Sequence, residues 1–200
     1  PPGIRRPSTL EISSGVLTLV TVPSMSNASI ADFTDKKNYS EAVYLDRIKR
    51  KTGALYSTAA ELGALVSPKT NLARDMYKYG ECVGILYQIT DDFLDLRNSL
   101  ITKTAVGDLA LKIPTLPLTK LANYPQYQKI IKEFIFNGNT KELIETIEIR
   151  HAQEVFESLI QPWQDMSMKF LEAVPESSTK ELLKQVPISF ANELISSDKN

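Results

Sequence analysis

The stretch from Gly80 to Arg97 constrains the fold of this chain more than any other part of the sequence. It contains no proline, and drawn as an α-helix it is apolar on nearly every face. A helix of that kind packs against neighbours on several sides, so we expect it to lie in the middle of a helical bundle.

The same stretch carries three acids, Asp91, Asp92 and Asp95, with Gln88 just before them. On a helix Asp91 and Asp95 lie one above the other, and Asp92 and Gln88 share an overlapping face. Buried ionised carboxylates need a positive charge nearby. Arg97 supplies one positive charge against three acids, so negative charge remains to be neutralised. Closely spaced carboxylates with an open side suit Mg²⁺. The alternative is a solvated acidic face that binds nothing, in a purely structural bundle.

The remaining sequence is helical in pattern as well. Apolar residues recur at helical spacing from Ser40 to Ser67-Pro68, where a helix must end. No strand is needed after residue 40, so the class is all-α, an antiparallel helical bundle. After a polar loop over 98–108, we expect helices over 116–122, 126–137, 141–162, 163–174 and 178–196, the last interrupted near Pro187.

The first part of the chain is different. We expect residues 1–38 to be a flexible, partly ordered segment, with a helix over 9–22 and a polar loop over 23–38, and residues 39–200 to form the domain. The chain starts Pro1-Pro2-Gly3 without an initiator methionine, which suggests a processed, truncated or tagged product.

Two further stretches could bind phosphate. Arg47, Lys49, Arg50 and Lys51 form a basic cluster, and a lysine such as Lys51 can neutralise a phosphate oxygen as a point charge. Lys103 lies in the loop after the acids, which resembles a lid that closes over phosphate and excludes water. The alternatives are a solvated basic helix face and an ordinary connecting loop.

Composition excludes other classes. The chain has 23 Lys plus Arg against 24 Asp plus Glu, so its charges nearly balance. A partner such as nucleic acid or an anionic membrane surface would call for a large excess of positive charge, which the sequence lacks. No apolar run reaches the length of a transmembrane segment. The single cysteine, Cys82, excludes a disulfide framework and favours a reducing compartment, the cytoplasm.

The order of these motifs resembles the C-terminal half of a trans-isoprenyl (polyprenyl) diphosphate synthase, over residues 40 to about 125. The matching positions are Lys51-Thr52, Gly80, Gly84, Gln88, Asp91, Asp92, Asp95, Lys103, Asp108-Leu109 and Thr115-Leu116-Pro117. The resemblance implies an isoprenoid synthase bundle and a reaction in which isopentenyl diphosphate attacks an allylic diphosphate, with Mg²⁺ as cofactor.

The resemblance also implies roles. Asp91, Asp92 and Asp95 would be the second Asp-rich motif and hold the metal, with Asp91 as a direct ligand. Lys51 and Lys103 would contact the allylic diphosphate. Gln88 and Thr52 would direct their oxygens at the developing cation.

No first Asp-Asp-x-x-Asp motif precedes residue 91. The bundle is therefore expected to be incomplete and inactive alone, as a C-terminal fragment or as one subunit of a homodimeric or heterodimeric synthase. The alternative function is a non-catalytic or regulatory chain that pairs with a catalytic prenyltransferase. Terpene cyclases share the fold, but the Lys-Thr pair and the lysine after the acids favour chain elongation.

Overall fold

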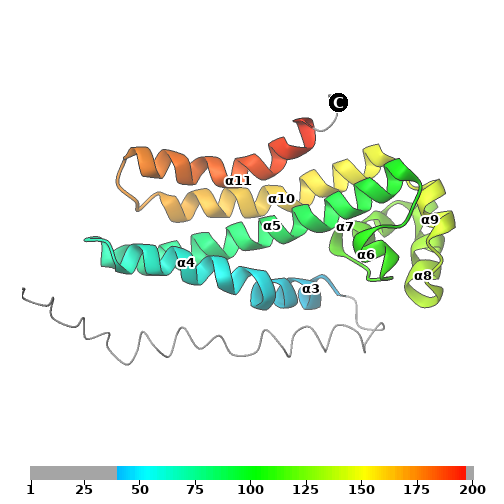
Figure 1. Ribbon diagram of the computed structural model, residues 1–200, viewed down its shortest axis with the longest axis horizontal. Helices are drawn as coiled ribbons and strands as arrows, with labels where there is room; N and C mark the ends of the chain where they lie inside the picture. Colours follow the sequence, from blue (N-terminus) through cyan, green and yellow to red (C-terminus); the bar gives the residue numbers. More distant parts are fainter. Residues whose placement is uncertain (1–39, 197–200) are drawn as a thin grey trace, which may run out of the picture.

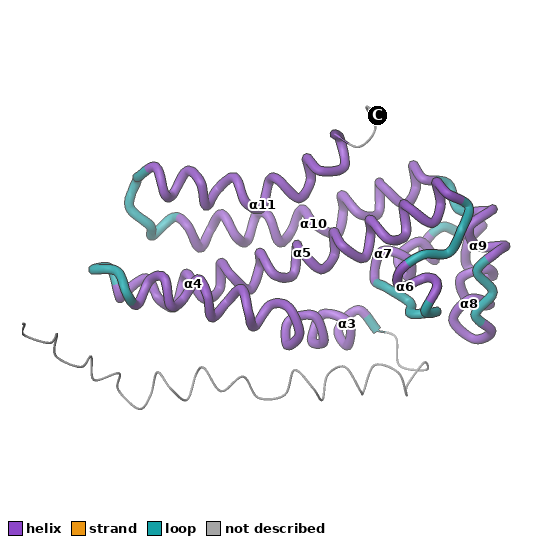
Figure 2. The backbone as a smooth tube through the Cα atoms, in the orientation of Figure 1, coloured by secondary structure: helices purple, strands orange, loops and turns teal. Residues whose placement is uncertain are grey.

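The computed structural model describes residues 40–196, with side chains as far as residue 190. The expectations for residues 1–38 fall outside this range. Every regular element in the described range is a helix, which confirms the all-α class (Figures 1 and 2). None of these helices is long and apolar enough to cross a membrane.

Long helices carry the bundle, and short helices close one end of it (Figure 1). The α-helices are α3 Glu41–Ile48, α4 Ala54–Leu65, α5 Ala73–Thr102, α6 Gly107–Ala110, α7 Leu116–Lys120, α8 Gln128–Asn137, α9 Lys141–Thr146, α10 Ile149–Leu171 and α11 Ser178–Ser196. Short 3₁₀ turns span Thr70–Leu72, Leu121–Asn123 and Pro125–Tyr127, and a π-helix spans Lys49–Gly53.

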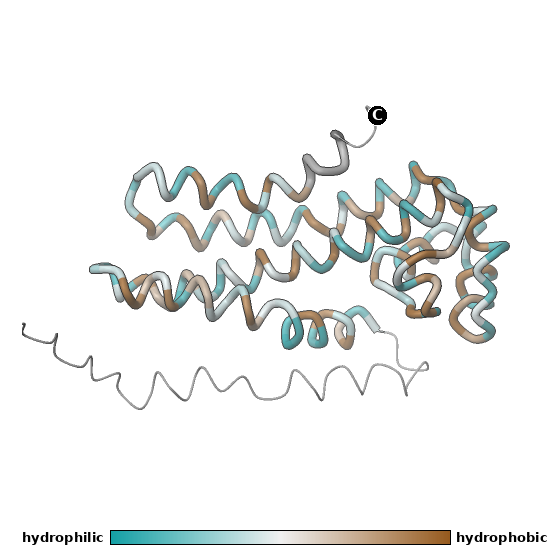
Figure 3. Tube along the Cα trace, in the orientation of Figure 1, coloured by the Kyte–Doolittle hydropathy of each residue, from teal (hydrophilic) through white to brown (hydrophobic). Residues whose placement is uncertain are grey.

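Helix α5 lies in the middle of the bundle, as predicted. It packs against α4 on one side and α10 on the other, and α11 contacts both α5 and α10. Ile85, Leu86, Ile89 and Leu100 on α5 have no exposed surface. Hydrophobic and hydrophilic residues alternate along α4, α5 and α10, as expected for helices with one buried face (Figure 3).

The π-helix sets the register between α3 and α4. Tyr44, Ile48, Gly53 and Ser57 are buried, and the step from Ile48 to Gly53 is five residues where the others are four. A π turn takes up that extra residue because its hydrogen bonds join residues five apart. The predicted single helix from residue 40 to 67 is therefore continuous but locally widened.

Two glycines of α5 allow the α4 side of the bundle to approach closely. A Cβ atom added at Gly84 would lie 2.8 Å from the Cα atom of Gly53 and 3.2 Å from the carbonyl oxygen of Thr52. One added at Gly80 would overlap the backbone of Tyr56 and Ser57. The two backbones therefore touch, which fixes how Thr52 faces α5.

Three sequence predictions of boundaries are wrong. The loop predicted over 98–108 is shorter, because α5 continues to Thr102, where Ser99 and Leu100 are buried. The helix predicted over 141–162 is broken at Ile147, whose backbone is extended. Pro162 ends no helix, because buried Ile160 and Ser167 hold α10 against the bundle on both sides of it.

The predicted interruption at Pro187 is also absent. Helix α11 runs from Ser178 to Ser196 through this proline. Pro187 is buried, and its carbonyl oxygen accepts a hydrogen bond of 2.9 Å from the Gln164 amide on α10. Packing and this hydrogen bond stabilise a helix that local propensity alone would interrupt.

The backbone contact predicts the effect of Gly84→Ala. The added methyl group meets backbone rather than a flexible side chain, so we expect a loss of about 1–3 kcal/mol in the free energy of unfolding. Chemical denaturation measures it. Gly63→Ala is the matched control, because nothing lies within 4 Å of the added atom, and helix propensity should stabilise it by about 0.5–1 kcal/mol. Equal effects of the two substitutions would contradict the contact.

Candidate functional site

Asp92 is the most buried acid of the chain's acidic motif, with 4% of its surface exposed. Its Oδ2 atom accepts a hydrogen bond of 2.6 Å from the Tyr44 hydroxyl, and its Oδ1 atom accepts one of 2.8 Å from the Gln88 amide nitrogen. Burial raises the pKa of Asp92 to about 7, against the opposite effect of these two bonds. The carboxyl group therefore changes charge near neutral pH.

Tyr44 was not predicted as a site residue. It is 2% exposed, and burial together with the neighbouring Asp92 raises the pKa of its hydroxyl well above the usual value. Its position one helical turn before Ile48 indicated only a core residue. A tyrosine on the apolar face of a basic helix was the available signal, since a buried hydroxyl needs a partner.

Asp91 and Asp95 lie in different surroundings from Asp92. Asp91 is exposed and Asp95 is half-buried, so the expectation that the acids are buried together is correct for Asp92 alone. Partial burial still raises the pKa of Asp91, and the charge of Asp95 adds to this.

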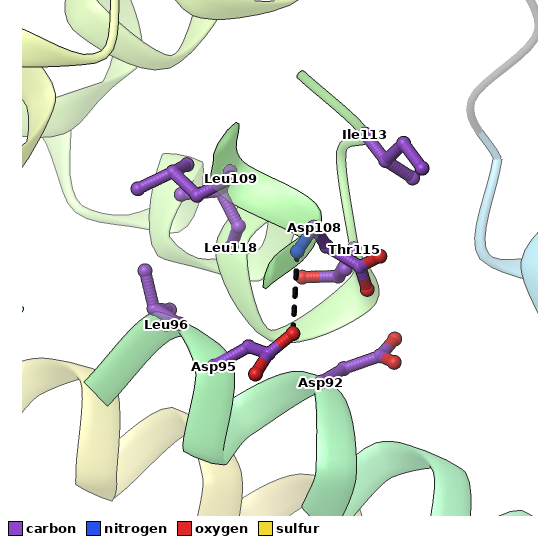
Figure 4. Close-up of a pocket in the computed structure, with 8 residues that line it drawn as sticks. All are labelled: Asp92, Asp95, Leu96, Asp108, Leu109, Ile113, Thr115 and Leu118. Atoms are coloured by element: carbon purple, nitrogen blue, oxygen red, sulfur yellow. Dashed lines mark hydrogen bonds between the residues drawn. The ribbon is translucent and has the colours of Figure 1, made fainter. Parts of the chain in front are cut away.

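A fourth acid, Asp108 on α6, completes the acidic group. Its backbone N–H donates a hydrogen bond of 3.2 Å to Asp95 Oδ2, and Figure 4 shows Asp92, Asp95 and Asp108 around one small cavity. Gly107 has a positive φ of 50°, and any Cβ atom there would overlap the Asp95 carboxylate. The Gly-Asp pair after the loop was a signal for this contact, although we had not predicted Asp108 as a site residue.

Mutual repulsion characterises the acids. Burial and then the charge of Asp95 raise the pKa of Asp108, and the charge of Lys51 partly opposes this for both Asp91 and Asp108. The site therefore carries more negative charge than Lys51 offsets.

The basic cluster divides between different surroundings. Arg47 and Lys51 line a cavity of about 50 Å³ together with Gln88, Asp92 and Asp108. Arg50 forms an ion pair of 3.0 Å with Asp46, four residues earlier on α3. The Lys49 ammonium group lies over the Trp163 ring, 5.7 Å from its centroid. The structure thus brings Lys51 to the acids, and it adds Arg47, which sequence reasoning left out of the site.

Thr52, Gln88 and Asp92 form a hydrogen-bonded line across the contact between the π-helix and α5. The Thr52 hydroxyl donates to Gln88 Oε1 at 2.8 Å, and the Gln88 amide nitrogen reaches Asp92 Oδ1 at 2.8 Å and Asp91 Oδ2 at 3.5 Å. The Gln88 oxygen therefore faces Thr52 and its nitrogen faces the acids. This orientation follows from the network, because only the nitrogen can donate to a carboxylate.

Lys103 is the one predicted site residue that lies apart from the others. It ends α5 in a left-handed conformation with φ 55°, and its ammonium group donates a hydrogen bond of 3.1 Å to the carbonyl oxygen of Ile144. The structure therefore places its charge on the α9 side of the loop, away from the carboxylates.

The donor atoms suit a hard divalent cation. Carboxylate oxygens with surplus negative charge are the ligands that Mg²⁺ prefers, and Mg²⁺ commonly takes one or two carboxylates and completes its shell with phosphate and water. Among the described side chains, no three His, Cys, Asp or Glu residues converge enough to hold a metal by themselves. A metal here would thus take further ligands from a bound phosphate or from water.

Comparison with known proteins identifies the class. The model of the polyprenyl synthetase family matches residues 14–149, more than half of the chain. The chain therefore belongs to the polyprenyl synthetase family. It is 27% identical over 176 residues to component 2 of the heptaprenyl diphosphate synthase of Bacillus subtilis, which covers 83% of this chain and 50% of that protein.

Solved structures share the fold. The decaprenyl diphosphate synthase of Rhodobacter capsulatus superposes with a TM-score of 0.74 at 22% identity, over 90% of this chain and 60% of that one. A polyprenyl synthase from Caulobacter crescentus, complexed with calcium and isoprenyl diphosphate, superposes with a TM-score of 0.69 at 22% identity, over 90% and 58%. The predicted isoprenoid synthase bundle is confirmed. The chain spans about half the length, or less, of the curated relatives it matches first.

The raised pKa of Asp92 predicts a pH-dependent stability. The folded state keeps the proton up to about pH 7, whereas an unfolded aspartate loses it near pH 4, so this group destabilises the fold progressively as pH rises between those values. We expect Asp92→Asn to remove this dependence, a difference of about 4 kcal/mol at most, in denaturation curves measured from pH 4 to 8. Asp165→Asn on the exposed side of α10 is the control. Parallel pH profiles for wild type and Asp92→Asn would contradict the assignment.

Proposed function

We propose that this chain forms part of a trans-polyprenyl diphosphate synthase, which condenses an allylic diphosphate with isopentenyl diphosphate to a longer prenyl diphosphate. The observation that carries the proposal is that the buried Asp92 and the half-buried Asp108 line one cavity together with Arg47 and Lys51. In such a site the cationic side chains can bind phosphate oxygens, and the carboxylates beside them can bind a metal ion.

In this proposal Asp91, Asp92 and Asp95 hold Mg²⁺, and Asp108 adds negative charge beside them. The metal, when bound, supplies Lewis-acid stabilisation of the leaving diphosphate. Lys51 and Arg47 bind the diphosphate oxygens from the α3 side of the cavity. The calcium and isoprenyl diphosphate bound to the Caulobacter crescentus synthase support this combination of ligands.

Gln88 and Thr52 are proposed to orient the acids and to present polar oxygens near the reacting carbons. The backbone contact at Gly53 and Gly84 supports this role, because it fixes Thr52 against Gln88 before any substrate binds. Preorganised dipoles of this kind stabilise charge that develops in a transition state. A role for Lys103 requires its ammonium group to leave the Ile144 carbonyl, so it is proposed only for a closed form of the loop.

The test is Asp91→Ala in the complete synthase. We expect turnover to fall by about 100-fold or more, the cost of removing one strong electrostatic contact to a developing charge. Incorporation of labelled isopentenyl diphosphate into extractable product measures it, and calorimetry with Mg²⁺ and pyrophosphate measures binding separately. Asp165→Ala is the control. Near-normal turnover with unchanged Mg²⁺ binding would exclude the metal role.

We also propose that the synthase needs polypeptide beyond the described residues, as a homodimer or a heterodimer. Two observations support it. The Bacillus subtilis relative is named as one component of its enzyme. Leu55 on α4 and Val66, directly after α4, are 64% and 85% exposed. Apolar side chains so exposed are typical of an interaction surface.

A paired expression experiment tests this second part. The full gene product is purified alone and after co-expression with prenyltransferase chains from its own genome, and mass and activity are measured for each. We expect activity only in the assembled form, and Leu55→Lys with Val66→Lys should prevent assembly while Leu111→Lys, at an exposed site on the turn after α6, should not. Full activity of the monomer would exclude the pairing.

A further inference from the structure

Tyr44 holds the most buried carboxylate of the acidic motif from another helix. Its hydroxyl on α3 donates a hydrogen bond of 2.6 Å to Asp92 Oδ2 on α5, across 48 positions of the sequence. The Tyr44 ring belongs to the main hydrophobic core. Close packing keeps a core side chain in one rotamer, so the hydroxyl has a fixed position against the carboxylate.

Asp92 lies where the two small cavities of the site meet. It lines the cavity shown in Figure 4, and it also lines the cavity of about 50 Å³ that Arg47 and Lys51 line. A carboxylate offers about four acceptor positions. The two hydrogen bonds from Tyr44 and Gln88 therefore leave Asp92 able to bind a metal ion or a metal-bound water as well.

Gln88 alone does not fix this carboxylate. Its amide nitrogen is shared, since it lies 2.8 Å from Asp92 Oδ1 and 3.5 Å from Asp91 Oδ2. One hydrogen bond leaves a carboxylate free to turn about the oxygen that accepts it, whereas a second bond to the other oxygen fixes the plane of the group. Tyr44 supplies that second bond. The Arg47 guanidinium lies over the Tyr44 ring, 5.1 Å from its centroid, so the same tyrosine also contacts a cation of the site.

We propose that Tyr44 is a positioning residue of the metal site, which holds the Asp92 carboxylate in the orientation that binds Mg²⁺ or a water of its shell. This inference rests on the proposed function, because it assigns Tyr44 a part in the same site. Tyr44 contacts neither metal nor substrate in this role and acts through Asp92. Groups that hydrogen-bond to metal-binding side chains orient them, and their loss commonly weakens metal binding by about 10- to 100-fold.

Tyr44→Phe tests the role, because it removes the hydroxyl and keeps the ring. In the complete synthase, calorimetric titration with Mg²⁺ in the presence of pyrophosphate should show binding weaker by about 10-fold or more. Turnover should fall at low Mg²⁺ and recover as Mg²⁺ is raised, with the KM for isopentenyl diphosphate unchanged.

Tyr79→Phe is the matched control. Tyr79 is 4% exposed, and its hydroxyl donates a hydrogen bond of 2.7 Å to the carbonyl oxygen of Leu183 on α11. The control thus loses a buried tyrosine hydrogen bond of the same kind, at a similar cost in the free energy of unfolding. It should leave Mg²⁺ binding and the Mg²⁺ dependence of turnover unchanged.

A double-mutant cycle separates positioning from a general structural role. Once Asp92→Asn is present, Tyr44→Phe should weaken Mg²⁺ binding no further, because its effect passes through that carboxylate. Circular dichroism verifies folding. If Tyr44→Phe does not fold, fluorine NMR of the synthase labelled with 3-fluorotyrosine decides instead: the resonance that Asp92→Asn displaces should also be displaced by Mg²⁺ with pyrophosphate.

The outcomes distinguish this role from the proposed function. Additive effects in the cycle, equal effects of Tyr44→Phe and Tyr79→Phe, or a fluorine resonance that responds to Asp92→Asn but not to Mg²⁺ with pyrophosphate would overturn the role of Tyr44 alone. A wild-type synthase that binds no Mg²⁺ would overturn the proposed function, and this role with it.

Discussion

The contact between two backbones, at Gly53 on the π-helix and Gly84 on α5, is the constraint on which the site depends. Because neither residue has a side chain, the π-helix approaches α5 closely enough for Thr52 to reach Gln88, and Gln88 in turn reaches Asp92. Gly80 holds α4 to the same distance one turn earlier. The polar line across the bundle is therefore a product of helix packing, and it does not require a ligand to form.

Electrostatics act against this arrangement. Asp92 lies in an apolar environment that favours its protonated form, and Asp91, Asp95 and Asp108 repel one another. Lys51 and Arg47, which line the neighbouring cavity, offset part of this negative charge. Functional sites commonly combine burial with like charges in this way. The conflict is local, because the surrounding core of α5 is fully packed. The packed core holds the carboxylates in place, although their charges repel one another.

Much of this could be predicted from the sequence. The apolar periodicity of residues 80–97 gave the central helix, and the all-α class followed from the absence of strand patterns. The site could be predicted only where residues share one helix. Asp108 and Tyr44 reach Asp92 from other elements, and no periodicity within one segment reveals such a contact. The boundary predictions at Pro162 and Pro187 failed for two reasons: buried Ile160 and Ser167 flank Pro162 on α10, and Pro187 is itself buried and accepts a hydrogen bond from Gln164 through its carbonyl oxygen.

The π-helix has a consequence for how this sequence can change in length. It accommodates one residue more than a regular helix would between Ile48 and Gly53. Deleting a single residue there would restore ordinary helical geometry and keep the relative rotation of α3 and α4, whereas regular α-helical geometry with all five residues retained would rotate all of α3 by about 100° relative to α4. Tyr44 and Arg47 would then face away from α5, while Ala54 to Leu65 stayed in place. The π geometry of Lys49–Gly53 therefore holds the two halves of the cavity together, and its loss without a deletion would turn Tyr44 and Arg47 away from the acids.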